Sequence, residues 1–291
     1  MVRLIALVAA LLLAILAARA DTLSDCTQDN DVEQKLRACT KLIEESSRDP
    51  EKRAHGHLNR GNAYQFKRDF ESAIIEFDQA VRLYPNSPTV YYNRGNAHQA
   101  KNDLDRSISD YDEVIRMAPD FAQAYNNRGR SFQGKMQLDR AIRDFDQAIA
   151  LNPAYFIAYI NRGNAYQALR QFDRAIADFN QALRIRPNDV MVFINRGNAY
   201  MDMRQFDRAI EDYDQAVWFD PGGAISYFNR GNALLQTGDV GRAIEDYDKA
   251  IELNPNIALA YRHRALAKTA KGDRAGAEAD MKMARTLDPR L

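Results

Sequence analysis

The sequence predicts an all-α protein in which antiparallel helix pairs stack into a solenoid, and three observations lead to this fold class. The string Asn-Arg-Gly-Asn-Ala and its close variants recur at one constant step, the step from Asn59 to Asn93. A small residue and an isoleucine follow most copies, with Phe or Tyr three residues after the isoleucine. A proline then closes each copy. A fixed period of this length is typical of a stacked repeat array.

The composition fits a folded chain that does not depend on bulk positive charge for binding. The 291 residues include 40 Lys and Arg, 40 Asp and Glu, and 46% hydrophobic residues, so the formal net charge is zero. This balance is too apolar and too neutral for a disordered tail. Neutralising phosphates requires a local excess of Lys and Arg, so a nucleic-acid binder that relies on overall charge is disfavoured.

The first twenty residues have the layout of a secretory signal peptide, 1–20. Arg3 precedes an apolar run, 4–18, that ends in Ala18-Arg19-Ala20. We expect cleavage after Ala20. The alternative is an uncleaved anchor, although a spanning helix needs about 20 apolar residues and this run is shorter. The sequence therefore predicts an exported protein, periplasmic or secreted, with no stable membrane insertion after cleavage.

Residues 21–53 are predicted to be an N-terminal capping segment that contains both cysteines of the chain, Cys26 and Cys39. Residues 32–46 fit an amphipathic helix with Cys39 on its apolar face. An oxidising compartment permits a Cys26–Cys39 disulfide, which would stabilise this end by about 2–4 kcal/mol. The alternative is a buried Cys39 thiol with Cys26 left free.

The rest of the chain divides into units of equal length, each expected to form two antiparallel helices. The seven units are 54–87, 88–121, 122–155, 156–189, 190–223, 224–257 and 258–291. In the fourth unit we expect the first helix over 156–169, a turn over 171–173 and the second helix over 173–185. Pro187 and its polar neighbours then end the second helix.

The motif of the fourth unit, Tyr159-x2-Arg162-Gly163-x2-Tyr166 followed by Ala175-x3-Phe179 and Pro187, resembles the tetratricopeptide repeat (TPR). The resemblance covers 54–291, and 32–46 resembles the second helix of a degenerate leading unit. It implies a right-handed superhelical solenoid of seven repeats. One departure is that the residue before the glycine, usually Leu in this family, is Arg in all seven copies.

These arginines have a matching series of acidic residues, one per unit. The arginines are Arg60, Arg94, Arg128, Arg162, Arg196, Arg230 and Arg264, and the acids are Glu76, Asp110, Asp144, Asp178, Asp212, Asp246 and Asp280. We infer partly buried Arg–carboxylate pairs between the helices of each unit, and breaking one would cost about 3–5 kcal/mol if it is buried. The functional alternative is a groove that binds anionic ligands.

The resemblance implies a concave groove, lined by the first helices, that binds peptide segments or partner helices. Six residues would face it: Asn62, Asn96, Arg130, Asn164, Asn198 and Asn232. An amide carries a donor and an acceptor, so an asparagine ladder could pair with an extended peptide backbone. The alternative is that these side chains only solvate the groove.

The groove wall is expected to be apolar in units four to six and more polar in units one to three. Ile160, Ile194 and Phe228, four residues before the groove position of their units, would form this wall. A second row lies seven residues before that position: Ile157, Met191, Ile225 and Leu259. An apolar strip of this length is a candidate partner site, or alternatively a surface for self-association.

No catalytic, metal or cofactor site is predicted. The four histidines are isolated substitutions in repeat slots, without the three- or four-residue helical spacing of a metal pair. No nucleophile motif or phosphate loop is present. We therefore predict a non-catalytic scaffold or adaptor for a protein or peptide partner, without nucleic acid; the alternative is a structural, homo-oligomeric envelope protein. Trp218 occupies a slot filled elsewhere by charged residues, which predicts partial exposure.

Overall fold

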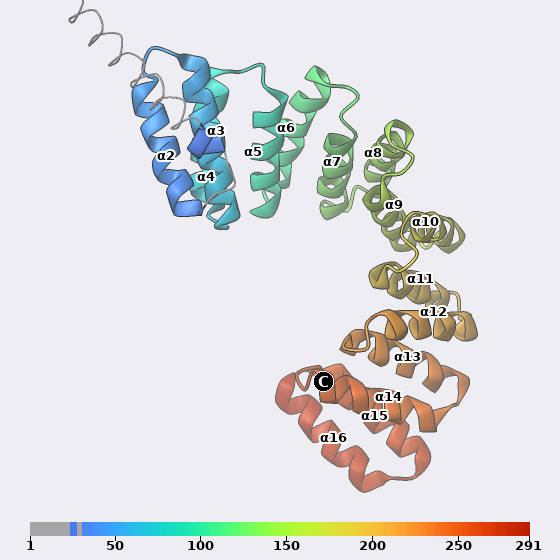
Figure 1. Ribbon diagram of the computed structural model, residues 1–291. Coiled ribbons are helices and arrows are strands. Elements are labelled where there is room, and N and C mark those ends of the chain that lie inside the picture. The colour runs from blue at the N-terminus through green and yellow to red at the C-terminus, as the bar shows by residue number, and fades with distance from the viewer. Residues whose placement is uncertain (1–23, 28–30) are drawn as a thin grey trace, which may run out of the picture. The chain divides into compact units, whose positions relative to one another are not determined.

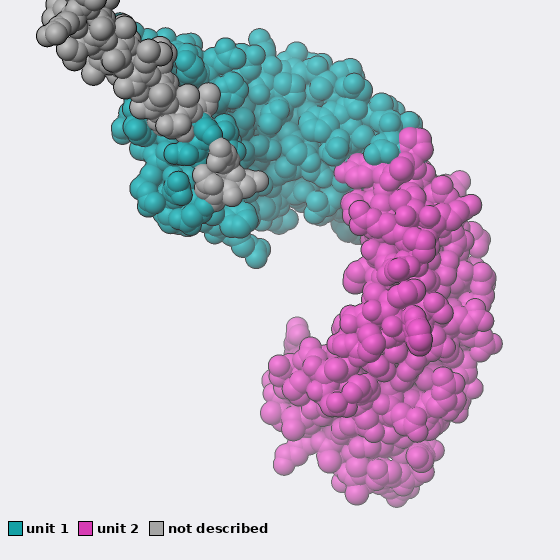
Figure 2. Space-filling view, viewed as in Figure 1, with its two compact units in different colours: residues 1–152 teal, residues 153–291 magenta. Residues whose placement is uncertain are grey.

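The computed structural model describes residues 24–27 and 31–291, and every regular element in them is helical. The predicted signal peptide, 1–20, lies outside the described residues. The chain divides into two compact units, unit 1 up to residue 152 and unit 2 from residue 153 (Figure 2). In the described part, no helix combines the length and hydrophobicity that a membrane span requires.

Unit 1 is a stack of helix pairs (Figure 1). Its helices are α2 (Val32–Glu45), α3 (Pro50–Phe66), α4 (Phe70–Leu83), α5 (Pro88–Ala100), α6 (Leu104–Met117), α7 (Ala122–Gly134) and α8 (Leu138–Leu151). The pairs are α3 with α4, α5 with α6 and α7 with α8, and the second helix of each pair packs on the first helix of the next. Helix α2 packs on α3, as expected for the second helix of a degenerate leading unit.

Unit 2 continues the same plan with four pairs (Figure 1). Its helices are α9 (Phe156–Ala168), α10 (Phe172–Ile185), α11 (Val190–Asp202), α12 (Phe206–Phe219), α13 (Ala224–Thr237), α14 (Val240–Leu253), α15 (Ala258–Lys271) and α16 (Arg274–Leu287). First helices begin at the constant step of the sequence repeat from Pro88 to Ala258, and second helices do so from Phe70 to Arg274. The predicted all-α solenoid of antiparallel helix pairs is confirmed.

The first repeat starts earlier than the sequence period predicts. Helix α3 begins at Pro50, so the expected boundary between 21–53 and the first unit falls inside a helix. The local sequence explains the early start. The side chain of Asp49 accepts a hydrogen bond from the backbone N–H of Lys52, and Pro50 is favourable at the first helical position because its φ is already fixed.

The turn within the fourth repeat lies two residues earlier than predicted, at Leu169–Gln171 rather than 171–173. Arg170 adopts a left-handed conformation, with φ of 58°. Its N–H donates to the carbonyl of Gln167, and the N–H of Gln171 donates to the carbonyl of Tyr166, both at 2.8 Å. These bonds satisfy carbonyls at the end of α9 in a Schellman motif. The turn between the paired helices of every repeat contains one residue with positive φ. These residues are Arg68, Asn102, Met136, Arg170, Arg204, Gly238 and Gly272.

The glycine of the first six motifs is required because an aromatic ring packs directly against it; the seventh has Ala265. A Cβ added to Gly197 would lie 2.6 Å from Cε1 of Tyr213, closer than such atoms can approach. The same relation joins Gly61 to Phe77, Gly95 to Tyr111, Gly129 to Phe145, Gly163 to Phe179 and Gly231 to Tyr247. These rings are almost completely buried. The repeat motif therefore encodes close packing between the two helices of each pair.

A disulfide joins Cys26 to Cys39 at the amino end. Cys26 lies on a helical turn at 24–27, and Cys39 lies on α2. Both are fully buried and pack with Leu42. The bond fixes this turn against a helix that itself packs on α3.

Candidate functional site

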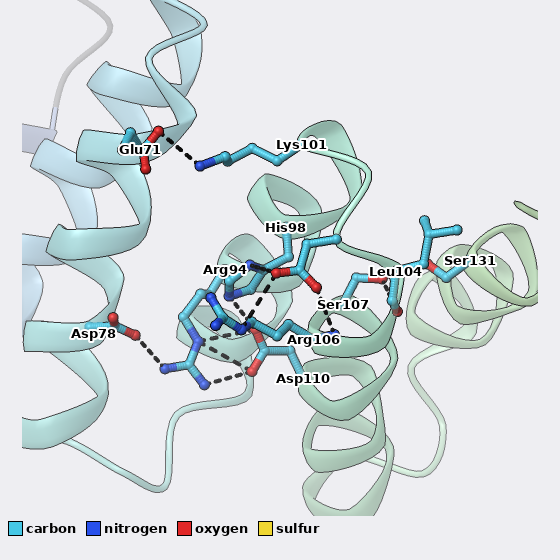
Figure 3. A network of polar contacts seen from close by, with 11 residues as sticks. Glu71, Asp78, Arg94, His98, Lys101, Leu104, Arg106, Ser107, Asp110 and Ser131 are labelled. Atoms are coloured by element: carbon cyan, nitrogen blue, oxygen red, sulfur yellow. Dashed lines mark hydrogen bonds and ion pairs between the residues drawn. The ribbon is translucent and has the colours of Figure 1, made fainter. Parts of the chain in front are cut away.

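A ladder of arginine–carboxylate pairs runs through the repeats, as the sequence predicts. Nη2 of Arg94 lies 2.6 Å from Oδ1 of Asp110, and its Nε lies 3.0 Å from Oδ2, so the pair is bidentate (Figure 3). The other pairs are Arg128–Asp144, Arg162–Asp178, Arg196–Asp212, Arg230–Asp246, Arg264–Asp280 and the single contact Arg60–Glu76. The planar fork of Arg favours this geometry.

The arginines also bind the preceding repeat, a contact that the spacing within one repeat does not predict. Nη1 of Arg94, on α5, lies 2.7 Å from Oδ1 of Asp78, on α4 (Figure 3). The same contact joins Arg128 to Asp112, Arg230 to Asp214 and Arg264 to Asp248, and Arg196 bonds Asn180 instead. The sequence does contain this information, because these partner residues recur at one position of the repeat. The arginine charges are thus used to join helices and repeats, against the anionic-groove alternative.

Burial and pairing act in opposite directions on these charges. Burial raises the pKa of the Asp110 carboxyl more than the adjacent Arg94 lowers it. Burial alone would lower the pKa of Arg94, but hydrogen bonds to Asp110 and Asp78 outweigh it and raise that pKa. Arg94 is therefore charged at any physiological pH, and its hydrogen bonds to Asp110 offset part of the effect that burial has on the pKa of that carboxyl.

The first rung of the ladder differs because a histidine shares the acid. Nδ1 of His57 lies 2.8 Å from Oε2 of Glu76, while Nη2 of Arg60 lies 2.9 Å from Oε1. With one oxygen used by His57, the pair is not bidentate, and the buried Nε of Arg60 has no partner. Burial raises the pKa of Glu76, but the hydrogen bonds from His57 and Arg60 outweigh burial and lower it overall.

The predicted groove asparagines use their oxygen atoms inside the protein. Oδ1 of Asn96 accepts from Nδ2 of Asn127 at 2.9 Å and from the Tyr111 hydroxyl at 2.8 Å. Oδ1 of Asn62, Asn198 and Asn232 likewise contacts Asn93, Asn229 and His263 of the next repeat. The oxygens of Asn96, Asn198 and Asn232 each accept two hydrogen bonds within the protein and that of Asn62 accepts one, so the expected donor-and-acceptor ladder needs correction. Their amide nitrogens are the groups left for a ligand.

The first-helix face of unit 1 is polar. The position seven residues before the groove position holds His55, Thr89 and Gln123, and all three are exposed. Arg130 is exposed and contributes to an open depression of about 390 Å³, whose other lining residues are Gln65, Asn96, Gln99, Ala100 and Asn127. The three first helices α3, α5 and α7 supply these residues.

The first-helix face of unit 2 is apolar. Exposed aliphatic side chains recur on α9, α11, α13 and α15: Ile157 is 41% exposed, Met191 61%, Ile225 50% and Leu259 43%. Ile160, Asn164 and Phe228 are half-buried. Ile194 is only 7% exposed, because it packs with Phe193, Ala216, Leu183 and Val190. The expectation that Ile194 forms part of an accessible wall is therefore wrong.

A depression of about 480 Å³ lies on the same face of unit 2. Its lining residues are Met201, Arg204, Phe206, Asn232, Leu235, Gln236, His263 and Leu266. Burial lowers the pKa of His263 from its ordinary value, and the Arg262 charge lowers it further. The imidazole is consequently neutral at neutral pH. The depression combines apolar side chains with neutral polar groups and one charged residue, Arg204, a composition suited to a peptide side chain.

Two further expectations concern residues outside these faces. Trp218, on α12, is 77% exposed, which confirms the predicted exposure. Within the described ranges, no three His, Cys, Asp or Glu residues gather in a way that could hold a metal ion.

Comparisons with known proteins identify similar sequences and folds. Tetratricopeptide repeat profiles match residues 58–120, 92–138, 156–189, 194–256 and 228–290, and a TPR repeat profile matches 137–170. No curated protein matches the chain.

Solved structures show the same fold at low identity. A tetratricopeptide repeat protein from Parabacteroides merdae has a TM-score of 0.66 at 18% identity, over 86% of this chain and 98% of that one. PilF of Pseudomonas aeruginosa has a TM-score of 0.60 at 17% identity, over 69% and 92%. YrrB, described as a TPR protein with an unusual peptide-binding site, has a TM-score of 0.53 at 23% identity, over 63% and 95%.

Proposed function

Because the chain belongs to the tetratricopeptide repeat family, whose members mediate protein–protein interactions, we propose that it is a non-catalytic scaffold for peptide segments or partner helices. The observation that carries the proposal is the row of exposed aliphatic side chains on the first helices of unit 2. Ile157, Met191, Ile225 and Leu259 occupy the same slot of successive repeats, on α9, α11, α13 and α15. Burying such a row against a partner would remove apolar surface from water.

The neighbouring depression supports binding of a peptide rather than a flat surface. It combines apolar side chains, among them Met201 and Leu235, with the Asn232 amide, the His263 ring and the charged Arg204 side chain. Apolar lining with a few polar groups suits one anchoring side chain of an extended or helical peptide. The peptide-binding site described for YrrB is consistent with this reading, although the similarity to YrrB concerns the fold.

Peptides selected from a random phage-displayed library on the full chain test the proposal. Met191→Glu places a charge in the middle of the exposed row, and we expect it to weaken binding about tenfold or more by calorimetry. Ile75→Glu is the matched control, because Ile75 is 56% exposed but lies on the second helix α4. Unchanged binding by Met191→Glu, or equal loss in both variants, would contradict the proposal.

The second candidate function is self-assembly through the same apolar row. A second copy could cover Met191 and Ile225 as well as a foreign peptide could. Light scattering at several concentrations separates the two. A mass that rises with concentration and falls back in Met191→Glu favours self-assembly, whereas the mass of a single chain at every concentration excludes it.

We also propose that the protein acts outside the cytoplasm. The apolar run that ends at Ala20 supports export, and so does the buried Cys26–Cys39 disulfide, since such bonds persist in oxidising compartments. Expression with the natural leader followed by cell fractionation tests this proposal. We expect an exported chain that begins at Asp21; a chain that keeps Met1 and stays in the cytosol would contradict it.

A further inference from the structure

We propose that the depression on unit 2 is a pocket that selects a tyrosine side chain, with Nε2 of His263 accepting a hydrogen bond from the phenol. The inference rests on the proposed peptide-binding function and names the side chain that unit 2 would recognise. His263 lines this depression of about 480 Å³, together with Asn232 and with apolar residues that include Leu235.

His263 replaces an asparagine at one position of the repeat. The other six repeats all have asparagine there. Nδ2 of Asn93, Asn127 and Asn229 donates to an asparagine oxygen of the preceding repeat. Nδ1 of His263 takes the same role, 2.6 Å from Oδ1 of Asn232. The histidine therefore keeps the bond that joins two repeats and adds an imidazole ring to the depression.

This bond fixes which ring nitrogen carries the proton. Oδ1 of Asn232 is an acceptor and also receives the hydroxyl of Tyr247 at 2.9 Å, so Nδ1 of His263 must be the donor. The ring is neutral at neutral pH, because burial and the Arg262 charge lower its pKa. A neutral imidazole with its proton on Nδ1 has a lone pair on Nε2, which is therefore a hydrogen-bond acceptor.

Nε2 of His263 is available to a ligand and is held in one direction. The described residues place no donor on this atom, and it is not fully buried. The ring centroid lies 5.4 Å from that of Phe228 and 6.2 Å from that of Tyr247, whose plane is turned by 81°. These contacts and the bond to Asn232 fix the ring. Because His263 lines the depression, its free acceptor opens into it.

A tyrosine side chain matches this combination of apolar wall and polar groups. Its ring would bury apolar surface against Met201, Phe206 and Leu235. Its hydroxyl would donate to Nε2 of His263 and accept from Nδ2 of Asn232. A phenylalanine would leave both polar groups without a partner, and a site that bonds a hydroxyl discriminates against a ligand that lacks one.

The charge of Arg204 makes an acidic side chain the alternative ligand. Arg204 lines the same depression and is exposed. An ionised carboxylate would pair with it, but it has no proton for Nε2 of His263 and would bring negative charge against that lone pair. Water also weakens the attraction of an exposed charge. The pocket therefore favours a group that both donates and accepts over one that only accepts.

The test uses four pentapeptides with blocked ends that differ only in the central residue, which is tyrosine, O-methyltyrosine, phenylalanine or glutamate. Calorimetry gives their affinities for the full chain, and the ring-nitrogen NMR signals of His263 report its tautomer and any bond to Nε2. We expect the tyrosine peptide to bind roughly tenfold more tightly than the other three and to shift the Nε2 signal most. The O-methyl peptide isolates the donated bond, because it keeps the ring and the oxygen but lacks the O–H.

His263→Asn is the informative variant, because it restores the residue of the other six repeats and keeps a donor toward Asn232, so it should fold. It should abolish the preference for tyrosine, whereas His55→Asn, at an exposed position of α3, should leave the preference intact. Equal binding of the tyrosine and phenylalanine peptides, tightest binding of the glutamate peptide, no binding of any of the four, or a proton on Nε2 of the free protein would overturn the inference.

These outcomes are distinguishable from a failure of the proposed function. Met191 does not line the depression, so the peptides selected on the full chain test the apolar row independently. If those peptides bind and Met191→Glu weakens them while tyrosine has no advantage, only the inference is overturned. If no selected peptide binds, both proposals are overturned.

Discussion

The two units have the same scaffold but present different side chains on their first helices. Both contain the same bidentate pairs, such as Arg94–Asp110 in unit 1 and Arg230–Asp246 in unit 2. In equivalent exposed slots, unit 1 has His55, Thr89 and Gln123, and unit 2 has Ile157, Met191, Ile225 and Leu259. The residues that hold helices together are thus repeated closely, while those that face outward vary. The proposed binding function therefore depends on the residues that vary between repeats.

A second difference lies at the turns between paired helices. In unit 1, Lys67, Lys101 and Lys135 form ion pairs with Glu33, Glu71 and Asp105 of the preceding repeat or helix α2. Unit 2 has Leu169, Met203 and Thr237 in three of the equivalent slots and Lys271 in the fourth. These pairs are largely exposed, and exposed pairs contribute about 0–1 kcal/mol. These pairs therefore make little difference to stability, and the main difference between the units is the chemistry of their first-helix faces.

The largest predicted effect tests the part that the units share. Asp110→Ala in unit 1 and Asp246→Ala in unit 2 each remove a buried acid and leave a partly buried guanidinium without its main partner, and we expect losses of about 3–5 kcal/mol. Urea unfolding followed by circular dichroism measures them. Asp78→Ala removes the more exposed partner of Arg94 and should cost under about 1 kcal/mol. A loss for Asp110→Ala as small as that for Asp78→Ala would contradict a shared structural ladder.

Steric contact at the repeated glycines gives the next largest effect. Gly95→Ala and Gly197→Ala place a Cβ 2.9 Å and 2.6 Å from the rings of Tyr111 and Tyr213. We expect losses of about 1–3 kcal/mol in the free energy of unfolding, larger in unit 2. Gly222→Ala is the control, because its nearest atom would be 3.5 Å away, and it should stay within about 0.5 kcal/mol of the parent. Equal stability of all three variants would contradict this account of the motif.

Exchanging the left-handed residues of two turns, one in each unit, should change stability by a smaller amount. Met136 in unit 1 adopts a φ of 57° although it is not glycine, and Gly238 in unit 2 occupies the equivalent position. Met136→Gly should raise stability, and Gly238→Met should lower it, each by about 1 kcal/mol, because a left-handed conformation is costly for a residue with a Cβ. Met136 is 75% exposed, so little packing is lost. Thermal unfolding measures both, and shifts of the same sign would refute the argument.

The smallest effect is the pH dependence contributed by one histidine in each unit. Burial lowers the pKa of His98 and His263 despite the raising effect of Asp110 and Asp103 on His98. The unfolded chain therefore binds these protons near pH 6.5 while the folded chain does not, so stability is full above that pH and falls as the pH drops toward the folded-state pKa. His98→Gln and His263→Gln should each flatten the decline of the urea midpoint between pH 7.5 and 5. An unchanged slope in both would contradict buried neutral imidazoles, and exposed His55→Gln serves as the control.

The sequence predicted the parts of the structure that the repeat itself specifies. The period placed the helices, and the spacing of Arg and acid predicted their pairing in each unit. The positions of Pro50 and Arg170 were missed because local capping chemistry, rather than the period, decides where a helix begins or ends. The bond from Arg94 to Asp78 was missed because it joins two repeats.

The outward face was harder to predict because accessibility depends on neighbouring side chains. Ile194 occupies the same slot as Ile160, yet Phe193 and Leu183 bury it. Asn96 looked like a ligand for a peptide backbone, but its oxygen is used by Tyr111 and Asn127. Both outcomes depend on contacts between repeats, which a motif read within one repeat does not contain.

Hydrogen exchange of the full chain bound to a peptide selected on it tests the central claim most directly. We predict that an apolar selected peptide slows exchange in α11 and α13, the helices that carry Met191 and Ile225, and leaves α12 and α14 unchanged. Protection confined to the second helices α12 and α14, or to α5 and α7 of unit 1, would contradict the account.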